Sequence, residues 1–146
     1  MYAMCTECGQ QGGIFMSSTI KRILVPVDGS VSSTKATEQA AYFAKACDAV
    51  IDFLYVASDV HKDIPSDIVF DEMVKKVPND IKYELHTASG NIARKVVEVA
   101  EELGDNIIIM GSRGLGIFRG ALIGSVSQKV IEESRLPVMV VKQNQR

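Results

Sequence analysis

Short apolar runs alternate with segments of helical spacing along most of this 146-residue chain. Five of the runs are rich in β-branched residues and end at turn residues, which is typical of buried strands. They cover residues 23–27, 49–56, 81–86, 107–110 and 137–141, and the third alternates in the manner of a more exposed strand. This strand–helix alternation predicts an α/β fold, an open five-stranded parallel sheet with helices on both faces.

The segments between the runs predict helices from their spacing and their end signals. The first helix follows three N-cap candidates, Ser30, Ser32 and Ser33. Its apolar face repeats with a period near 3.6 residues and consists of Ala36, Ala40, Phe43, Ala44 and Cys47. A short helix is expected among the loops of residues 58–80.

Two further helices complete the alternation. One follows residues 89–91 and ends at Gly104, a position where a left-handed residue is favoured. Its apolar face consists of Ile92, Val96, Val99, Ala100 and Leu103. The last helix is expected over residues 126–133, and Ser125 with Gln128 has the spacing of a capping box at its start.

The segment between the fourth strand and the last helix, residues 111–127, contains five glycines and three serines. A strand that breaks into glycine and leads into a helix is suited to phosphate. Glycine lets the backbone approach a ligand, exposed N–H groups point at its oxygens, and the helix N-terminus favours negative charge. This segment therefore predicts an anion site, and specifically a nucleotide site.

A second signal points to the same end of the sheet. Ligands of open parallel sheets bind outside the carboxyl ends of the strands, where the strand order reverses. Asp28 follows the first strand and Gly111 the fourth. If those strands are neighbours, as in the orders 2-1-3-4-5 and 3-2-1-4-5, both loops open into one crevice. The alternatives at this point are a plain turn residue at Asp28 and a glycine loop without a ligand.

The glycine segment does not fit the commonest nucleotide motifs. The stretch from Gly120 to Ser125 has one residue too few for a Walker A loop and lacks its lysine. Gly114 and Gly116 open like a dinucleotide fingerprint, but the third glycine comes one step late and after the fourth strand rather than the first. Both readings are therefore poorly supported.

The spacing that is met in full is G-2x-G-9x-G-[ST], by Gly111, Gly114, Gly124 and Ser125. With this motif the chain resembles the universal stress protein family, in its ATP-binding branch. The resemblance covers about residues 20–143 and includes residues 25–30 and 137–141. We therefore expect an N-terminal extension over residues 1–18 and a universal stress protein domain over residues 19–146.

The resemblance implies a sheet of order 3-2-1-4-5, an adenine nucleotide alpha hydrolase-like fold, and a homodimer formed through the last strand. It implies that Asp28 binds the ribose hydroxyls or a nucleotide-bound Mg²⁺ ion. It also implies that Pro26 and Val27 contact the nucleoside and that backbone near Val56 holds the adenine edge. The remaining cofactor-binding positions would be Met110, Gly111, Arg113, Gly114, Gly124, Ser125, Val126 and Ser127.

The function implied is that of an ATP-binding sensor or switch in the stress response, with little or no hydrolysis. The alternatives are a nucleotide-free or AMP-binding interaction module of the same fold, and a slow ATPase. No set of residues suited to general acid–base catalysis can be argued from spacing, so no catalytic residue is expected.

Composition and termini bound the remaining classes. The formal net charge of −2 argues against a nucleic-acid surface, which needs a marked basic excess. No apolar run approaches the roughly 18 residues that cross a bilayer, and the N-terminus lacks the pattern of a secretory signal. We therefore expect a cytoplasmic protein. The apolar last strand, with Val138, Val140 and Val141, is expected at a sheet edge, where it would pair with a second copy.

The cysteines and histidines receive no chemical role. Cys47 is expected to be a buried thiol on its helix. Cys5 and Cys8 have metal-ligand or redox spacing, but the chain has no second such pair to complete a zinc site. We expect an incidental pair, with a disulfide or a metal shared between subunits as the alternatives. His61 and His86 are expected to be surface or strand-face residues.

Overall fold

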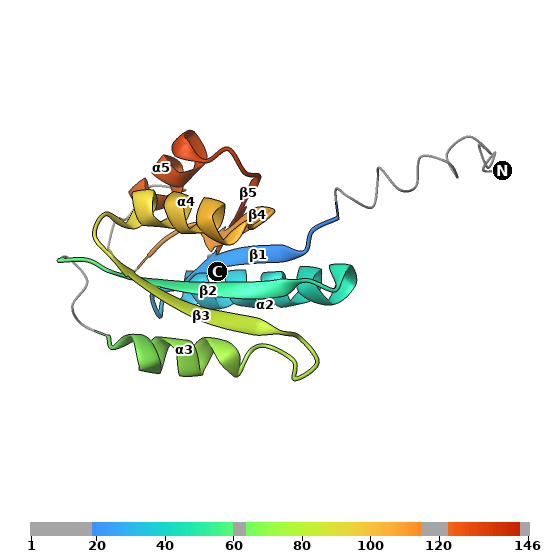
Figure 1. Ribbon diagram of the computed structural model, residues 1–146. Helices are drawn as coiled ribbons and strands as arrows, with labels where there is room; N and C mark the ends of the chain where they lie inside the picture. The colour runs from blue at the N-terminus through green and yellow to red at the C-terminus, as the bar shows by residue number, and fades with distance from the viewer. Residues whose placement is uncertain (1–18, 60–63, 115–122, 144–146) are drawn as a thin grey trace, which may run out of the picture.

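The computed structural model describes residues 19–59, 64–114 and 123–143. Strands and helices alternate throughout, as expected (Figure 1). The strands are β1 (Arg22–Pro26), β2 (Val50–Ala57), β3 (Tyr83–Ser89), β4 (Ile107–Gly111) and β5 (Val138–Val141). The helices are α2 (Val31–Cys47), α3 (Ser66–Val74), α4 (Ile92–Leu103) and α5 (Ser125–Glu133). Within the described part of the chain, none of these helices is both long and apolar enough to cross a lipid bilayer.

The five strands form one parallel sheet in the order β3-β2-β1-β4-β5. This confirms the predicted fold class and strand order. β1 is the central strand, and at its midpoint Leu24 pairs with Asp52 of β2 on one side and Ile108 of β4 on the other. Helices α2 and α3 cover one face of the sheet, and α4 and α5 cover the other (Figure 1).

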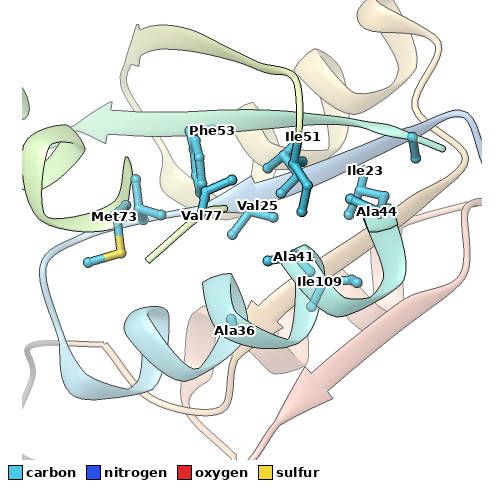
Figure 2. Close-up of a cluster of buried hydrophobic side chains, with 14 of the residues drawn as sticks. Ile23, Val25, Ala36, Ala41, Ala44, Ile51, Phe53, Met73, Val77 and Ile109 are labelled. Carbon is cyan, nitrogen blue, oxygen red and sulfur yellow. The ribbon is translucent and has the colours of Figure 1, made fainter. Parts of the chain in front are cut away.

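The core beneath α2 depends on small side chains. Four alanines of the helix are at most 5% exposed, and they lie against Ile23, Val25 and Ile109 of the sheet (Figure 2). Because alanine is short, the helix lies close to β1 and β4, and their carboxyl ends are held beside its first turn. Cys47, at the end of the helix, is half-buried rather than buried as expected, because it lies at the margin of this core.

The predictions made for the ends of the helices are only partly confirmed. Ser30 caps α2, and its hydroxyl accepts a hydrogen bond from the Ser33 N–H; Gly104 is left-handed at the end of α4, with a φ of 72°. The capping box at α5 was wrong. The N-cap is Gly124, so Gln128 lies one position too late to reach back, and its side chain instead contacts Glu132.

The third strand begins and ends later than expected, at Tyr83 and Ser89. Ile81 lies before it in a turn, where its N–H donates to the Pro78 carbonyl and its side chain is buried. Within the described residues the strand pairs only with β2, at the edge of the sheet, and its Leu85 is 47% exposed.

Gly111, the last residue of β4, packs directly on the first turn of α2. A Cβ atom built on Gly111 would lie 2.7 Å from the Ser32 carbonyl carbon and 2.8 Å from its Cβ atom, and closer still to its Oγ atom. These distances leave no room for any side chain at position 111. The glycine therefore permits the contact between the end of β4 and the start of α2.

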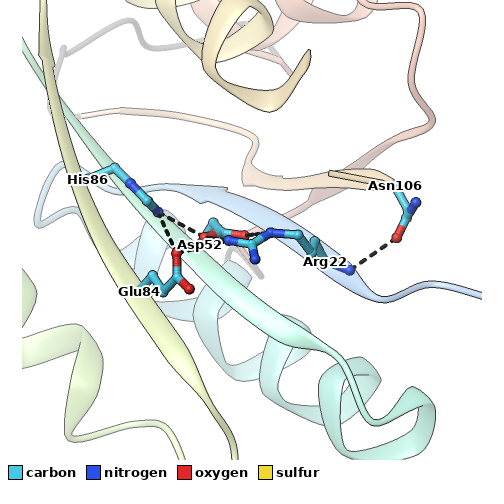
Figure 3. A network of polar contacts seen from close by, with 5 residues as sticks. All are labelled: Arg22, Asp52, Glu84, His86 and Asn106. Atoms are coloured by element: carbon cyan, nitrogen blue, oxygen red, sulfur yellow. Dashed lines mark hydrogen bonds and ion pairs between the residues drawn. The ribbon is translucent and has the colours of Figure 1, made fainter. Parts of the chain in front are cut away.

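The amino-terminal half of the sheet holds a charged cluster on the face covered by α4 and α5 (Figure 3). At its centre is Asp52, whose side chain is fully buried in the apolar β2. Arg22 donates to both Asp52 oxygens, from Nε at 2.9 Å and from a terminal nitrogen at 2.6 Å, and also contacts Glu84 at 3.0 Å. The hydrogen bond to Asp52 is the main cause that raises the pKa of Arg22. His86 Nε2 lies 2.8 Å from Asp52 Oδ1.

A second carboxyl group, Asp105, adjoins this cluster from the turn before β4. It is 4% exposed, and within the described part of the chain neither of its oxygens has a hydrogen-bond partner. Burial, followed by the negative charge of Asp52, raises the pKa of Asp105 to about 8. Asp105 is therefore protonated in the folded protein at neutral pH. In the unfolded chain its pKa is near 3.8, so there it is ionised at neutral pH.

We expect Gly111→Ala to destabilise the protein by about 1–3 kcal/mol, the usual cost of forcing an atom into packed space. The measurement is denaturant unfolding of the variant in the wild-type and the Ser32→Gly backgrounds. Removing the Ser32 side chain relieves two of the three close contacts, so the cost should be smaller in that background. An equal cost in both would mean that the Ser32 contact is not its origin.

We expect Asp105→Asn to change how stability depends on pH. Because the folded pKa is raised, unfolding releases a proton between pH 4 and pH 8, so the free energy of unfolding falls by up to about 1.4 kcal/mol per pH unit as pH rises through that window. Asparagine does not ionise and avoids this loss. Denaturant unfolding in the presence of a chelator measures the free energy of unfolding at pH 5 and pH 8. Relative to the wild type, the variant should be more stable at pH 8 than it is at pH 5. A pH-independent difference would contradict the assignment.

Candidate functional site

The loop after β1 forms a tight turn around Asp28. Asp28 Oδ1 accepts a hydrogen bond from the Ser30 N–H at 2.9 Å, which fixes the carboxylate at the entrance to α2. Gly29 between them has a φ of 83°, a conformation that favours glycine. The aspartate is thus half-buried at the carboxyl end of the central strand, in a fixed orientation.

The chain leaving β4 is joined to the start of α5 by backbone. The Ser112 carbonyl accepts a hydrogen bond from the Gly124 N–H at 2.7 Å, while the Ser112 N–H donates to Val141 of β5. A Cβ atom on Gly124 would lie 3.2 Å from the Ser112 carbonyl oxygen, so a glycine is favoured at this contact. The first and last parts of the G-2x-G-9x-G-[ST] motif therefore lie side by side.

The loops after β1 and β4 touch each other. A Cβ atom on Gly114 would lie 2.8 Å from Asp28 Oδ2, so the carboxylate is directed at bare backbone. The Arg113 N–H donates to Ser32 Oγ at 3.2 Å, and the Ser30 hydroxyl lies 3.4 Å from the Arg113 carbonyl. The predicted meeting of these two loops at the carboxyl end of neighbouring strands is confirmed.

The first turn of α5 presents its N-terminus at the same place. The helix begins at Ser125 after Gly124, whose φ of −71° and ψ of 161° are extended. Ser125 is exposed and Val126 half-buried, whereas Ser127 is 3% exposed and donates its hydroxyl proton to the Gly111 carbonyl. The Ser127 hydroxyl therefore tethers the helix to β4. The first-turn N–H groups carry the partial positive charge of the helix end.

The other predicted contact residues lie in the packed layers beneath these loops. Val27 is 4% exposed on the α2 side, and Val56 and Met110 are 7% and 5% exposed on the α4 and α5 side. Pro26 is half-buried at the end of β1. Val27 also donates its N–H to the Leu54 carbonyl. The side chains of Val27, Val56 and Met110 thus support the loops from within the core.

Several residues singled out in the sequence fall outside the described residues. They are Cys5, Cys8, His61, Gly116 and Gly120. The described part of the glycine segment is therefore its two ends, residues 111–114 and 123–127.

Two residues, Ser32 and His86, make contacts that the sequence did not suggest. Ser32 was predicted only as a helix cap, yet it packs against Gly111 and accepts a hydrogen bond from the Arg113 N–H. The signal that could have indicated this is its position four residues after Asp28, in the same turn of chain. His86 was given no role, yet it joins Asp52 and Glu84 in one cluster. The signal there was a lone carboxylate within the apolar β2, opposite polar residues at alternating positions of the neighbouring strand.

Comparison with known proteins agrees with this architecture. The family model described as "Universal stress protein family" matches residues 19–142. The universal stress protein MJ0531 of Methanocaldococcus jannaschii is 31% identical over 139 residues, covering 84% of this chain and 82% of the relative. Universal stress protein G of Escherichia coli O157:H7 is 32% identical over 142 residues, covering 84% and 99% respectively.

Solved structures share the fold. The protein MJ0577 of M. jannaschii superposes with a TM-score of 0.76 at 26% identity, covering 88% of this chain and 99% of that protein. A universal stress protein in complex with cAMP has a TM-score of 0.70 at 24% identity, covering 85% and 98%. Family proteins from Archaeoglobus fulgidus with dAMP and from Arabidopsis thaliana with AMP each have a TM-score of 0.64 at 20% identity; both cover 85% of this chain, and 99% and 92% of those proteins.

The family match extends over most of the chain, and the sheet order, the Asp28 turn and the split glycine motif all lie within it. Universal stress protein G, of which 99% is covered, is a member of the same family. The chain belongs to the universal stress protein family.

Proposed function

We propose that this protein binds an adenine nucleotide, ATP with Mg²⁺, between the Asp28 turn and the two ends of the glycine segment. The observation that carries the proposal is the approach of Asp28 Oδ2 to Gly114, where a side chain on residue 114 would begin only 2.8 Å from the carboxylate. An acidic group and bare backbone thus meet at the carboxyl rim of β1 and β4. Such a rim, at the point where strand order reverses, is where α/β sheets bind ligands.

The two sides of this meeting point suit different parts of a nucleotide. A carboxylate beside polyphosphate is unfavourable unless it binds hydroxyl groups or a cation, so Asp28 is proposed to bind the ribose hydroxyls or phosphate-bound Mg²⁺. The N-terminus of α5, together with Gly111, Arg113, Gly114 and Ser125, is proposed to hold the phosphates. Pro26, Val27, Val56 and Met110 would flank the nucleoside, chiefly through backbone.

The complexes of related folds support an adenylate rather than another anion. The cAMP, dAMP and AMP complexes named above are of universal stress proteins that share this fold. The extension to ATP rests on the G-2x-G-9x-G-[ST] spacing of Gly111, Gly114, Gly124 and Ser125. The protein is proposed to act as a cytoplasmic nucleotide-dependent switch of the stress response. Little or no hydrolysis is proposed, because the motif lacks the lysine that contacts the β- and γ-phosphates of P-loop enzymes.

We expect ATP with Mg²⁺ to raise the melting temperature of the nucleotide-free protein. At 100 times its Kd a ligand adds about 2.7 kcal/mol, which for a domain of this size is roughly 5–10 °C. Gly124→Asp should abolish the shift, because it puts a negative charge at the helix N-terminus. Asp28→Asn, which can keep the turn with Ser30, should lose the part of the shift that depends on Mg²⁺.

Gly124→Asn is the matched control for this experiment. Asparagine and aspartate are similar in size and are both good N-cap residues, so both variants should fold with similar stability in the absence of nucleotide. A large loss of the ATP shift in the aspartate variant alone would identify charge repulsion. A wild-type melting curve unchanged by millimolar ATP and AMP would refute the proposed function, and a shift with AMP alone would favour the alternative AMP-binding module.

We also propose a homodimer formed through β5. Among the residues that the structure describes, this strand lies at the sheet edge and pairs only with β4. The carbonyls of Pro137 and Val141 accept hydrogen bonds from β4 and the residue following it. Because backbone groups alternate along a strand, those of Val138 and Val140 point outward, toward a second copy. The half-buried valines of the strand would become less exposed to solvent in such a pair.

We expect Val140→Pro to convert the dimer into a folded monomer, since proline removes an outward N–H and is tolerated on edge strands. Met139→Pro is the matched control, because the N–H of residue 139 points toward β4 and its loss should unfold the strand. Light scattering gives the mass and circular dichroism the fold. A wild-type protein that is monomeric at micromolar concentration would contradict the proposed dimer.

A further inference from the structure

We propose that the charged cluster in the amino-terminal half of the sheet is a binding site for a divalent transition-metal ion of the Zn²⁺ type. Its ligands are Asp52 of β2 with Glu84 and His86 of β3 (Figure 3). The site lies on the face covered by α4 and α5, toward the strand ends opposite the Asp28 turn. It is therefore separate from the proposed nucleotide site.

The geometry of the three ligand atoms fits one small cation. Asp52 Oδ1, Glu84 Oε2 and His86 Nε2 all lie within 4.8 Å of one another, with 2.8 Å from His86 to Asp52 and 3.6 Å from His86 to Glu84. Ligands at 2.0–2.1 Å in a tetrahedral zinc site are about 3.3–3.4 Å apart. Small side-chain adjustments bring the three atoms to this spacing.

The ligand set selects the class of metal. One imidazole nitrogen with carboxylate oxygens suits Zn²⁺, Co²⁺, Ni²⁺ or Mn²⁺, whereas Ca²⁺ and Mg²⁺ prefer oxygen alone. Asp52 is fully buried and held in the sheet, so its position is set by the fold. Glu84 is 52% exposed and can open a path from solvent to the cluster.

An independent observation also points to a bound cation. Both Asp105 oxygens are buried and have no hydrogen-bond partner among the residues described, although this carboxyl group adjoins Asp52. A buried carboxyl group without a donor is costly, and two facing carboxyl groups need a positive charge or a proton between them. A metal ion on Asp52 would provide that charge.

The charge of the cluster matches a divalent ion. The two carboxylate ligands, Asp52 and Glu84, together carry two negative charges, and Arg22 balances part of that charge when no metal is bound. Arg22 occupies the Asp52 and Glu84 oxygens in the metal-free protein. Its side chain is 27% exposed at the start of β1, so it can turn to solvent as the metal takes its place.

The test is titration of the metal-stripped, nucleotide-free full chain with Co²⁺, followed by absorbance and calorimetry. All proteins carry Cys5→Ser and Cys8→Ser, which remove the competing cysteine pair. We expect one saturable site and a higher melting temperature with Zn²⁺. His86→Gln should weaken binding at least tenfold, while His61→Gln, a change of the only other histidine, should leave it unchanged.

Two further variants keep the test decisive. If His86→Gln does not fold in chelator, Glu84→Gln replaces it, since a half-exposed side chain is a milder change, and the same tenfold loss is expected. Arg22→Gln should tighten binding, because the competing cation is gone. No saturable Co²⁺ binding at millimolar metal, or binding that neither His86→Gln nor Glu84→Gln weakens, would show a structural ion-pair cluster only. Weaker binding by Arg22→Gln would contradict the exchange of Arg22 for metal.

Discussion

The pairing of β1 with both β2 and β4 is the constraint on which the rest of this structure depends. The first strand lies at the centre of the sheet, so the chain reverses its direction of travel across the sheet on either side of it. The loops after β1 and β4 therefore leave from adjacent strand ends. Gly111 makes this arrangement possible, because β4 could not lie against Ser32 of α2 if residue 111 had a side chain.

The two ends of the sheet are polar for different reasons. At the carboxyl rim, the Ser30 N–H donates to Asp28 and Ser32 Oγ accepts from the Arg113 N–H, and these bonds fix both loops above the buried core. In the amino-terminal half, Asp52 is enclosed by the apolar layer beneath α4; Arg22 balances its charge, and His86 lies within hydrogen-bond distance of it. Both groups lie on or directly after strands of one sheet, so the pairing of those strands sets how their members lie relative to one another.

Sequence reasoning was most successful where one local pattern has one structural outcome. The β-branched run before Asp28, the alanine face of α2 and the left-handed Gly104 could each be recognised from a few neighbouring residues. It was least successful at the ends of strands and helices. Tyr83 and Ser89 bound β3 because β2 offers partners that far along, and Gly124 replaces the expected cap because the Ser112 carbonyl holds its N–H. Those partners are remote in sequence.

The sequence by itself determined the α/β class, the two loops that carry polar or glycine residues, and the family to which the chain belongs. These follow from periodicity and motif spacing, which are properties of neighbouring residues. Only the tertiary structure decided that Asp28 faces Gly114, that Ser127 is tied to Gly111, and that Asp52, Glu84, His86 and Asp105 gather in one place. Such meetings depend on strand register and on the approach of a helix to a sheet. They are set by the packing of the whole core rather than by any single segment.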